Sequence, residues 1–443
     1  MEVGIMLNKD GVSTSSLRSN CAKFAFLVYL GVLFFGTSVP FQEKIKDVSE
    51  IATSNVVNQY LFSSLYLLAC VGLIGKWRVV SRLILQEKWL FIFIAWSLLS
   101  VFWSEYTLVS FKRWLQLFGS VLICLSALVN FRNEEEALVC LKAVLLIYLP
   151  LTIASIILVP GSVHLDNAAW RGFAPHKNIL GQACLVSLLV WICSWRRTMT
   201  RSGQSLCLLC AAISLALLVG SKSMTSLFTV LILLFLCVLI AAVRKIIQPL
   251  IGQFAAWLLI VTLLACYGGV LLVYPEILAE VVGFFGREIN LTGRSDLWAR
   301  VLEETGGRFL LGWGYGGFWV VNSPWLDSLY SDFIWLPNQA HQGYLDILIE
   351  TGVVGFAIVF LLLLSYFRKL AGSEQSHLWK WFVVMTLIVN ITESTLLKAN
   401  TLTGTMFLFS YLFLMFESRR RQEWMTFVQG QQRTRLFREE GSV

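Results

Sequence analysis

The chain has 443 residues, of which 57% are hydrophobic and only 14% charged, and its formal net charge is +8. Soluble globular chains carry about a quarter charged residues, so this composition excludes a soluble enzyme and predicts an integral membrane protein. Apolar runs long enough to cross about 30 Å of hydrocarbon recur along most of the chain. Lys and Arg residues cluster in the short turns between these runs, a pattern typical of membrane orientation rather than of nucleic-acid binding.

The N-terminal apolar run follows charged residues but lacks a convincing small-residue cleavage site. We interpret this run as a retained first span. The ten cysteines are scattered through the apolar runs, which favours packing roles over a disulfide framework. Cys207 and Cys210 form a Cys-x-x-Cys pair, but their apolar surroundings disfavour redox or metal chemistry.

Hydropathy predicts an all-α integral membrane protein with about twelve transmembrane helices. The expected spans are residues 22–39, 60–75, 89–104, 114–131, 138–159, 178–195, 204–220, 225–243, 250–273, 343–367, 380–397 and 401–416. The predicted organisation is therefore helices 1 to 9 within residues 1–273, one large outward loop at 274–342, helices 10 to 12 within 343–416, and a tail at 417–443.

Alternate turns are basic in the phase that places both termini in the cytoplasm. These turns carry Lys9, Arg18 and Lys23, then Lys76, Arg78, Arg82 and Lys88, then Arg196, Arg197 and Arg201, then Arg244 and Lys245, then Arg368, Lys369 and Lys380, and finally Arg419, Arg420 and Arg421. The 132–137 turn is weak, because Arg132 is followed by three glutamates. In this phase the long loop lies outside the membrane.

The outward loop contains two recognisable local patterns. Residues 294–302 have the spacing of an amphipathic helix, with Leu297, Trp298 and Val301 on its apolar side. Residues 312–317 are too rich in glycine for a stable helix. Such a run suits tight turns or a close approach of backbone to a ligand.

Several cationic residues lie on the predicted outer side, against the usual bias of positive charge toward the inside. They are Arg171, His176, Lys177, Lys222, Arg287, Arg294, Arg300 and Arg308. An outward-facing anion is their natural counterpart, since an arginine fork matches a phosphate or diphosphate bidentately. A solvated loop face, or contact with anionic lipid headgroups, is the alternative for each of them.

His341 lies at the outer end of an expected span, where an imidazole can exchange protons near neutral pH and act as a general base. A hydrogen-bonded surface histidine is the alternative. The loop aromatics, including Trp313 and Tyr315, fit either stacking on sugar rings or an interfacial belt. The outer side has no Asp-x-Asp, and the chain has no phosphate-binding loop, zinc-protease helix or Gly-x-Ser-x-Gly elbow. We therefore expect a donor that needs neither ATP nor a metal, and no cofactor.

One spacing carries a family resemblance. His341-Gln342 is followed by nine residues and then by Gly352-Val353-Val354-Gly355. With the topology above, it resembles the O-antigen ligase and polysaccharide polymerase family of bacterial inner membranes, most closely its exopolysaccharide polymerase-like members.

Three other segments bear on this resemblance. Residues 171–181 resemble the family's Gly-x-Phe-x-His-x-Asn segment, and residues 294–314 resemble its Arg-x-x-x-Leu…Gly-x-Gly stretch. Trp298 stands where ligases commonly carry Leu. Residues 221–226 resemble the family's Ser-x-Ser-Arg-Thr segment, but Met224 occupies the position of the arginine. Lys222 or Arg171 would then have to supply the second cation.

The resemblance implies transfer of a glycan from an undecaprenyl diphosphate carrier to a sugar hydroxyl, with inversion, in a fold akin to multi-spanning lipid-donor glycosyltransferases. It implies that His341 is the base and that Arg294 stabilises the diphosphate. The substrate-binding candidates are Arg171, His176, Lys222, Arg300, Gln342, Trp313 and Tyr315.

Three functions fit this reading of the sequence. The first is a polymerase joining lipid-linked repeats into exopolysaccharide or O-antigen. The second is a ligase moving a finished glycan to lipid A core or protein, and the third is a transporter of lipid-linked sugars. The expected partners are the lipid-linked donor, a glycan or lipid-linked acceptor, membrane lipids and a chain-length regulator, with no nucleic acid.

Overall fold

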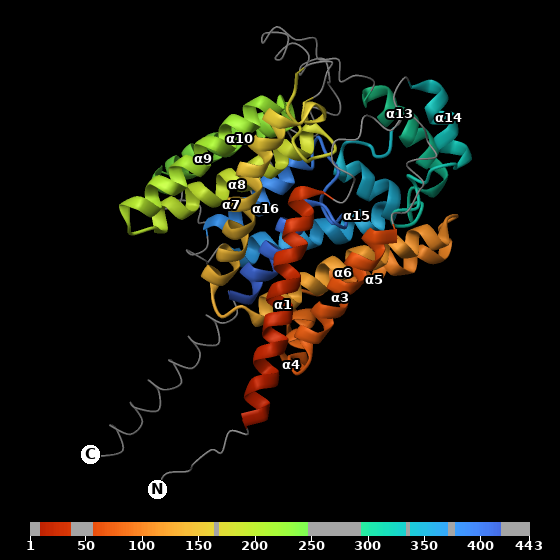
Figure 1. The fold of residues 1–443 in the computed structure, drawn as a ribbon. Helices are drawn as coiled ribbons and strands as arrows, with labels where there is room; N and C mark the ends of the chain where they lie inside the picture. The colour runs from red at the N-terminus through yellow and green to blue at the C-terminus, as the bar shows by residue number, and fades with distance from the viewer. Residues whose placement is uncertain are drawn as a thin grey trace.

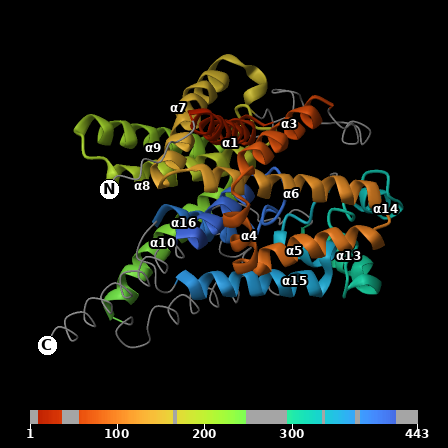
Figure 2. The ribbon, with the colours of Figure 1, turned by 90° about the horizontal axis from the view of Figure 1, so that it is seen from below.

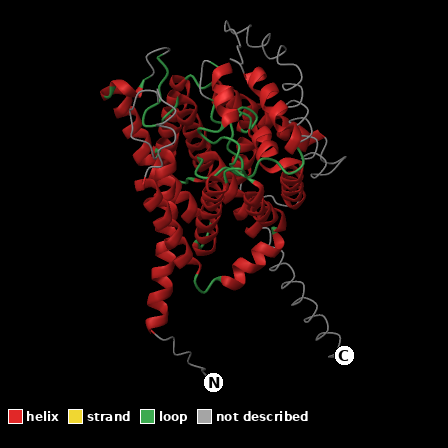
Figure 3. Cartoon of the chain, turned by 90° about the vertical axis from the view of Figure 1, so that its right-hand side faces the viewer, coloured by secondary structure: helices red, strands yellow, loops and turns green. Residues whose placement is uncertain are grey.

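The computed structural model describes residues 9–36, 56–163, 168–246, 294–333, 337–370 and 377–417. Within these ranges the chain forms helices and loops, without strands, and an isolated antiparallel bridge joins Val163 to Trp170 (Figure 1; Figure 3). The expected all-α fold class is confirmed.

The first half of the chain supplies mostly long helices. They are α1 (Lys9–Phe35), α3 (Val56–Leu73), α4 (Trp77–Gln86), α5 (Lys88–Leu99), η1 (Ser100–Trp103), α6 (Thr107–Asn130), α7 (Glu134–Leu158), η2 (Pro160–Ser162), α8 (Lys177–Arg197), α9 (Arg201–Ser221) and α10 (Met224–Ile246). The second half contains α13 (Arg294–Thr305), η3 (Gly306–Arg308), α14 (Pro324–Asp332), α15 (Gly343–Leu370), α16 (His377–Val389) and a last helix, Leu402–Glu417.

The helices are those of a multi-pass membrane protein. Seven are long and apolar enough to cross a bilayer, α4 and α5 together form an eighth candidate bent by 88°, and three further apolar helices are shorter. Every expected span falls at least partly on one of these helices, except span 250–273, which lies outside the described residues together with loop residues 274–293. The count of about twelve crossings stays a prediction.

Two hydrophobic clusters organise the interior. The larger one runs through the helical bundle, where α8 packs on α9, α1 on α3 and α15 on α5. The smaller one joins α13 to the loop that follows it and to the first turns of α15, and it includes Leu297 and Val301 of α13, which are fully buried. The amphipathic helix expected at residues 294–302 is therefore confirmed as α13.

The chain departs from the expected spans in two places. The span expected at 380–397 is wrong in its second half, because α16 ends at Val389 and residues 390–401 form a largely buried loop. Asn390 Oδ1 accepts from the backbone N–H groups of Thr395 and Leu396, an alternative to helical hydrogen bonding. The second departure is α4, an additional helix in the stretch expected to be a turn between spans.

Candidate active site

His341 occupies the short connection before α15. Its φ of +51° is left-handed, a conformation that costs a non-glycine residue about 1 kcal/mol or more. Gln342 caps the following helix, because its Oε1 accepts from the backbone N–H of Leu345. This cap fixes the start of α15 two residues after His341.

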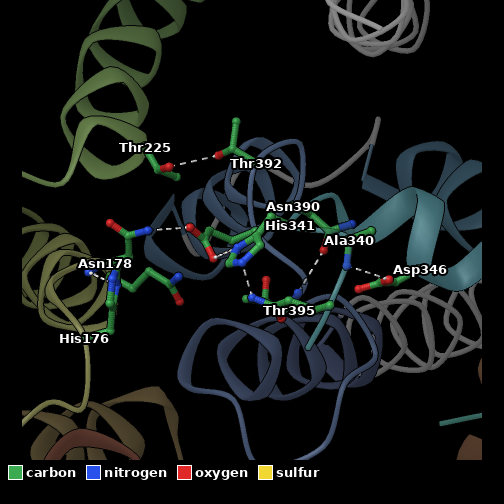
Figure 4. Close-up of polar contacts among 12 residues, drawn as sticks. His176, Asn178, Thr225, Ala340, His341, Asp346, Asn390, Thr392 and Thr395 are labelled. Atoms are coloured by element: carbon green, nitrogen blue, oxygen red, sulfur yellow. Dashed lines mark hydrogen bonds and ion pairs between the residues drawn. The ribbon is translucent and has the colours of Figure 1, made fainter. Parts of the chain in front are cut away.

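A buried carboxylate faces the imidazole of His341. Nδ1 of His341 lies 3.5 Å from Oε2 of Glu393 and 3.2 Å from Nε2 of Gln339. The other oxygen of Glu393 accepts a hydrogen bond of 2.7 Å from Nδ2 of Asn178, near the start of α8. Figure 4 labels Asn178 and His341, and its dashed lines mark these contacts. A carboxylate at one ring nitrogen orients an imidazole and stabilises its protonated form, which is what a general base requires.

The loop after α16 positions Glu393. Gly343 donates its N–H to the carbonyl of Asn390, so the loop lies against the start of α15. A Cβ on Gly343 would lie 2.0 Å from Asn390 Oδ1, so this approach requires glycine. Thr392 Oγ1 donates to Thr225 Oγ1 near the start of α10 (3.1 Å; Figure 4). Contacts from α8, α10 and the start of α15 thus fix the loop that carries the Glu393 carboxylate.

The residue before His341 is fixed from both sides. Ala340 is fully buried; its carbonyl accepts from Nε1 of Trp298 at 2.8 Å, and its N–H donates to Oδ1 of Asp346 at 3.1 Å. Figure 4 shows the contact between Ala340 and Asp346. Trp298 lies one helical turn after Arg294 on α13, so α13 contacts the site directly. Arg294 begins that helix, and its side chain lies outside the described part of the structure.

The glycine-rich run 312–317 makes the close backbone approach expected of it, and its partner is the protein itself. Gly312 has a φ of +74°, and a Cβ on it would lie 2.5 Å from the backbone nitrogen of Gly352. Arg113 of α6 donates to the carbonyls of Gly316 and Trp319, and Glu350 of α15 accepts from the N–H of Gly316 at 2.9 Å. Partly buried polar side chains from two helices therefore hold this loop.

The other predicted cations lie on segments around the same end of the bundle. Arg171 is buried, with its guanidinium on the carbonyls of Gly161 and Pro175. His176 is exposed and caps α8, because its Nδ1 accepts from the N–H of Asn178 at 3.3 Å. His176 therefore lies two residues from the side chain that holds Glu393.

Lys222 ends α9 in a left-handed conformation, with a φ of +50°. Two residues before it, the carbonyl of Gly220 accepts from the N–H of Trp170. Two residues after it, Met224 begins α10. Arg300 is partly exposed, and its guanidinium lies 3.4 Å from both Glu303 Oε2 and Ser328 Oγ. Substrate binding by these cations stays a prediction.

Trp313 and Tyr315 are both buried. The guanidinium of Arg308 lies over the Trp313 ring, 4.2 Å from its centre. The hydroxyl of Tyr315 donates to the carbonyl of Leu397 at 2.9 Å, and burial raises the pKa of this phenol. In this conformation both rings pack within the protein, and their contact with sugar stays a prediction.

Comparison with known proteins agrees with this arrangement. Residues 209–360 match the family model described as O-antigen ligase. The matched region runs from α9 through His341 and past Gly355. The chain is also 23% identical over 353 residues to the exopolysaccharide production protein ExoQ of Rhizobium meliloti (strain 1021), covering 74% of this chain and 77% of that protein. These matches support the O-antigen ligase and polymerase-like family.

Sequence reasoning missed Glu393, Gln339 and Lys398, and it gave no role to Asn178, which belongs to the segment at residues 171–181. Glu393 had a usable signal, since a carboxylate inside an expected apolar span is costly and marks a functional site. Lys398 donates to Gln339 Oε1 at 3.2 Å, and Gln339 in turn contacts His341. No spacing in the sequence predicts that contact. Among the described residues, no group of three His, Cys, Asp or Glu side chains is arranged to hold a metal ion.

Proposed function

We propose that this protein is a glycosyltransferase that joins undecaprenyl-diphosphate-linked oligosaccharide repeats into exopolysaccharide or O-antigen, on the outer face of the inner membrane. The observation that carries the proposal is the imidazole of His341, with Nδ1 facing the buried carboxylate of Glu393 at 3.5 Å. The O-antigen ligase family model and the exopolysaccharide production protein support this class of reaction.

The proposed reaction is a direct displacement at the anomeric carbon. The acceptor hydroxyl oxygen bonds to that carbon while its proton passes to the imidazole of His341. The bond from the carbon to the carrier phosphate breaks, and its electron pair leaves with the diphosphate. Glu393 stabilises the imidazolium that forms, as a carboxylate does in other base-catalysed transfers. A single displacement inverts the configuration of the sugar.

Arg294 would hold the diphosphate and stabilise the charge that develops on it. The contact between Trp298 and Ala340 supports this role, because it places the α13 turn that follows Arg294 beside the His341 segment. Arg171, His176 and Lys222 would add positive charge around the same carrier, while Arg300 and Gln342 are the remaining polar candidates. Because a diphosphate is a good leaving group, positioning and charge stabilisation can carry the rate without a metal.

Incubating the purified protein with a lipid-linked repeat as the only substrate tests the polymerase activity. A polymerase produces a ladder of longer lipid-linked glycans. A ligase, which the description of the family model names, produces none until a lipid A core or protein acceptor is supplied.

Variants of the site separate the enzyme from a transporter. We expect His341→Ala and Arg294→Ala to lower the polymerisation rate by about 10² to 10⁴ fold, the usual contribution of a general base or a charge-stabilising group. The polymerisation rate of Glu393→Gln should lie between the rates of these variants and that of the wild type. Glu304→Gln is the matched control, since this carboxylate is exposed on α13 and has no role in the proposed site. Normal polymerisation by His341→Ala together with failed carrier translocation would favour a transporter.

A further inference from the structure

A polar pocket, separate from the His341 site, lies at the opposite end of the bundle. Its volume is about 600 Å³, and its walls come from the beginning of α1, the turn between α3 and α4, and the end of α6. In Figure 1 the beginning of α1 and α4 lie at the lower end of the molecule, away from α13 and α14. Figure 2, which views the molecule from this end, shows α1 nearly end-on beside α3.

The floor of the pocket is closely packed. A Cβ on Gly72 would lie 2.6 Å from the Cβ of Ala22 and 2.4 Å from the hydroxyl of Ser126, so α1, α3 and α6 meet here without space for a larger residue. Asn130 is buried, and its amide donates to the carbonyls of Gly72 and Ser126 at 2.8 and 2.9 Å. These contacts fix the three helix ends relative to one another.

Four cationic side chains line the pocket above this floor. They are Arg18, Lys23, Lys76 and Arg132. Lys23 pairs with Glu136 at 2.7 Å, and Arg132 contacts the same carboxylate at 4.0 Å. No carboxylate in the described part of the chain pairs with Arg18 or Lys76. Glu136 therefore neutralises only part of the charge that these segments bring together, and an anion would relieve the repulsion that remains.

The surroundings of the pocket identify the source of that anion. Leu17, Ile74 and Trp77 beside it are 64%, 53% and 70% exposed. On α3, Leu67 is exposed as well, so an apolar face leads up to the pocket. A large exposed tryptophan next to cations is typical of the level at which lipid headgroups lie. A soluble anion would not need this apolar rim.

We propose that this basic pocket binds the phosphate headgroup of an anionic phospholipid, whose acyl chains lie along the exposed apolar face of α3. Arg18 and Lys76 contact the phosphate, with Lys23 and Arg132 adding positive charge. The hydroxyls of Ser15, Ser16 and Ser19 line the same pocket, and that of Ser19 donates to the carbonyl of Asn130 at 3.5 Å. The site is independent of glycan transfer, because its residues come from the opposite end of the bundle.

Native mass spectrometry of the full-length protein in detergent, titrated with phosphatidylglycerol or phosphatidylcholine, tests this proposal. The pocket variant is Arg18→Gln/Lys76→Gln. Its matched control is Arg78→Gln/Arg82→Gln, which removes the same charge from α4 at the same end of the molecule but outside the pocket. Since each cation near a headgroup contributes about fivefold in affinity, the pocket variant should bind phosphatidylglycerol roughly 25-fold more weakly, and the control less than about threefold.

Three results would overturn the proposal. Equal losses in the pocket and control variants would mean general surface attraction, and equal binding of phosphatidylcholine would remove the need for negative charge. Displacement of the lipid by millimolar inorganic phosphate would assign the pocket to a soluble anion. If the double variant fails to fold, Arg18→Gln and Lys76→Gln alone should each weaken binding about fivefold. His341→Ala should bind the lipid as the wild type does.

Discussion

Trp298 connects the two candidate catalytic residues through a single hydrogen bond. Its indole N–H donates to the carbonyl of Ala340, the neighbour of His341, and it lies one helical turn from Arg294. The backbone at Ala340 is fully buried, so its carbonyl has few alternatives if the indole is removed. The departure from the leucine of related ligases thus has a structural consequence, and we infer that Trp298 is a positioning residue.

The substitution Trp298→Phe tests this positioning role. The phenyl ring keeps most of the apolar packing, but the buried carbonyl of Ala340 loses its donor, at a cost of about 1 to 3 kcal/mol. If the hydrogen bond positions α13 against His341, kcat for glycan transfer should fall about tenfold while KM for the lipid-linked donor changes little.

Trp325→Phe is the matched control for this substitution. Trp325 belongs to the same aromatic cluster and is buried, but its indole N–H has no hydrogen-bond partner in the described structure. Its replacement should leave kcat unchanged. A purely structural role for Trp298 would appear as a lower melting temperature with kcat retained, and that result would reject the positioning role.

At the scale of elements, the glycines of the family signature have a packing function. Gly352 interrupts α15 with a φ of +68°, and the carbonyl of Leu310 approaches to 2.2 Å from where a Cβ would stand. The N–H groups freed by this break donate across to the loop, from Val353 to the Phe309 carbonyl and from Val354 to that of Leu310. The break therefore joins α15 to the segment that follows α13.

We predict that Gly352→Ala strongly destabilises the protein. The strained backbone alone costs about 1 to 3 kcal/mol, and the clash with the backbone of Leu310 cannot be relieved by a side-chain rotation. Thermal unfolding in detergent should show a clearly lower midpoint. Gly306→Ala is the control, because nothing lies within 4 Å of the added methyl group, and its midpoint should match the wild type. Equal midpoints for the two variants would contradict this account of the signature.

The sequence predicted the long helices well, because sustained hydropathy and amphipathic spacing are local properties of the chain. It predicted α13 through the apolar positions Leu297 and Val301, while the catalytic role that the spacing suggests for His341 stays a prediction. It failed at residues 390–401, where hydropathy continues after Val389 but Asn390 turns the backbone by its own hydrogen bonds. Hydropathy averages over windows and does not detect one such side chain.

The same limitation hid the partner of His341. Glu393 lies 52 positions later in the sequence and approaches the imidazole only because α16 ends early and the loop folds back on α15. Likewise, Trp313 and Tyr315 looked like surface aromatics, yet they lie buried because Arg113 and Glu350 hold the loop between them. Contacts between distant segments are properties of the folded chain, and a single sequence does not encode them in any short pattern.

At the scale of the whole molecule, the weak turn at residues 132–137 has an explanation. Arg197 pairs with Glu134 at 2.8 Å, and Lys23 pairs with Glu136 at 2.7 Å. Two of the glutamates that reduce the net positive charge of this turn are therefore paired with basic residues of two other predicted cytoplasmic segments. The start of α1, the α6–α7 turn and the α8–α9 turn lie together at one end, as a single membrane side requires.

This arrangement predicts the sidedness of the protein. The basic end should face the cytoplasm, and the end with α13 and His341 should face outward, because positively charged loops are retained inside. Gly306→Cys places a thiol on the open surface after α13, and Met199→Cys places one in the α8–α9 turn, where the side chain is 95% exposed. A membrane-impermeant maleimide applied to spheroplasts should label Gly306→Cys beyond the wild-type background. Met199→Cys should react only after the membrane is permeabilised. The reverse pattern would place His341 inside the cell, away from any glycan assembled on the outer face.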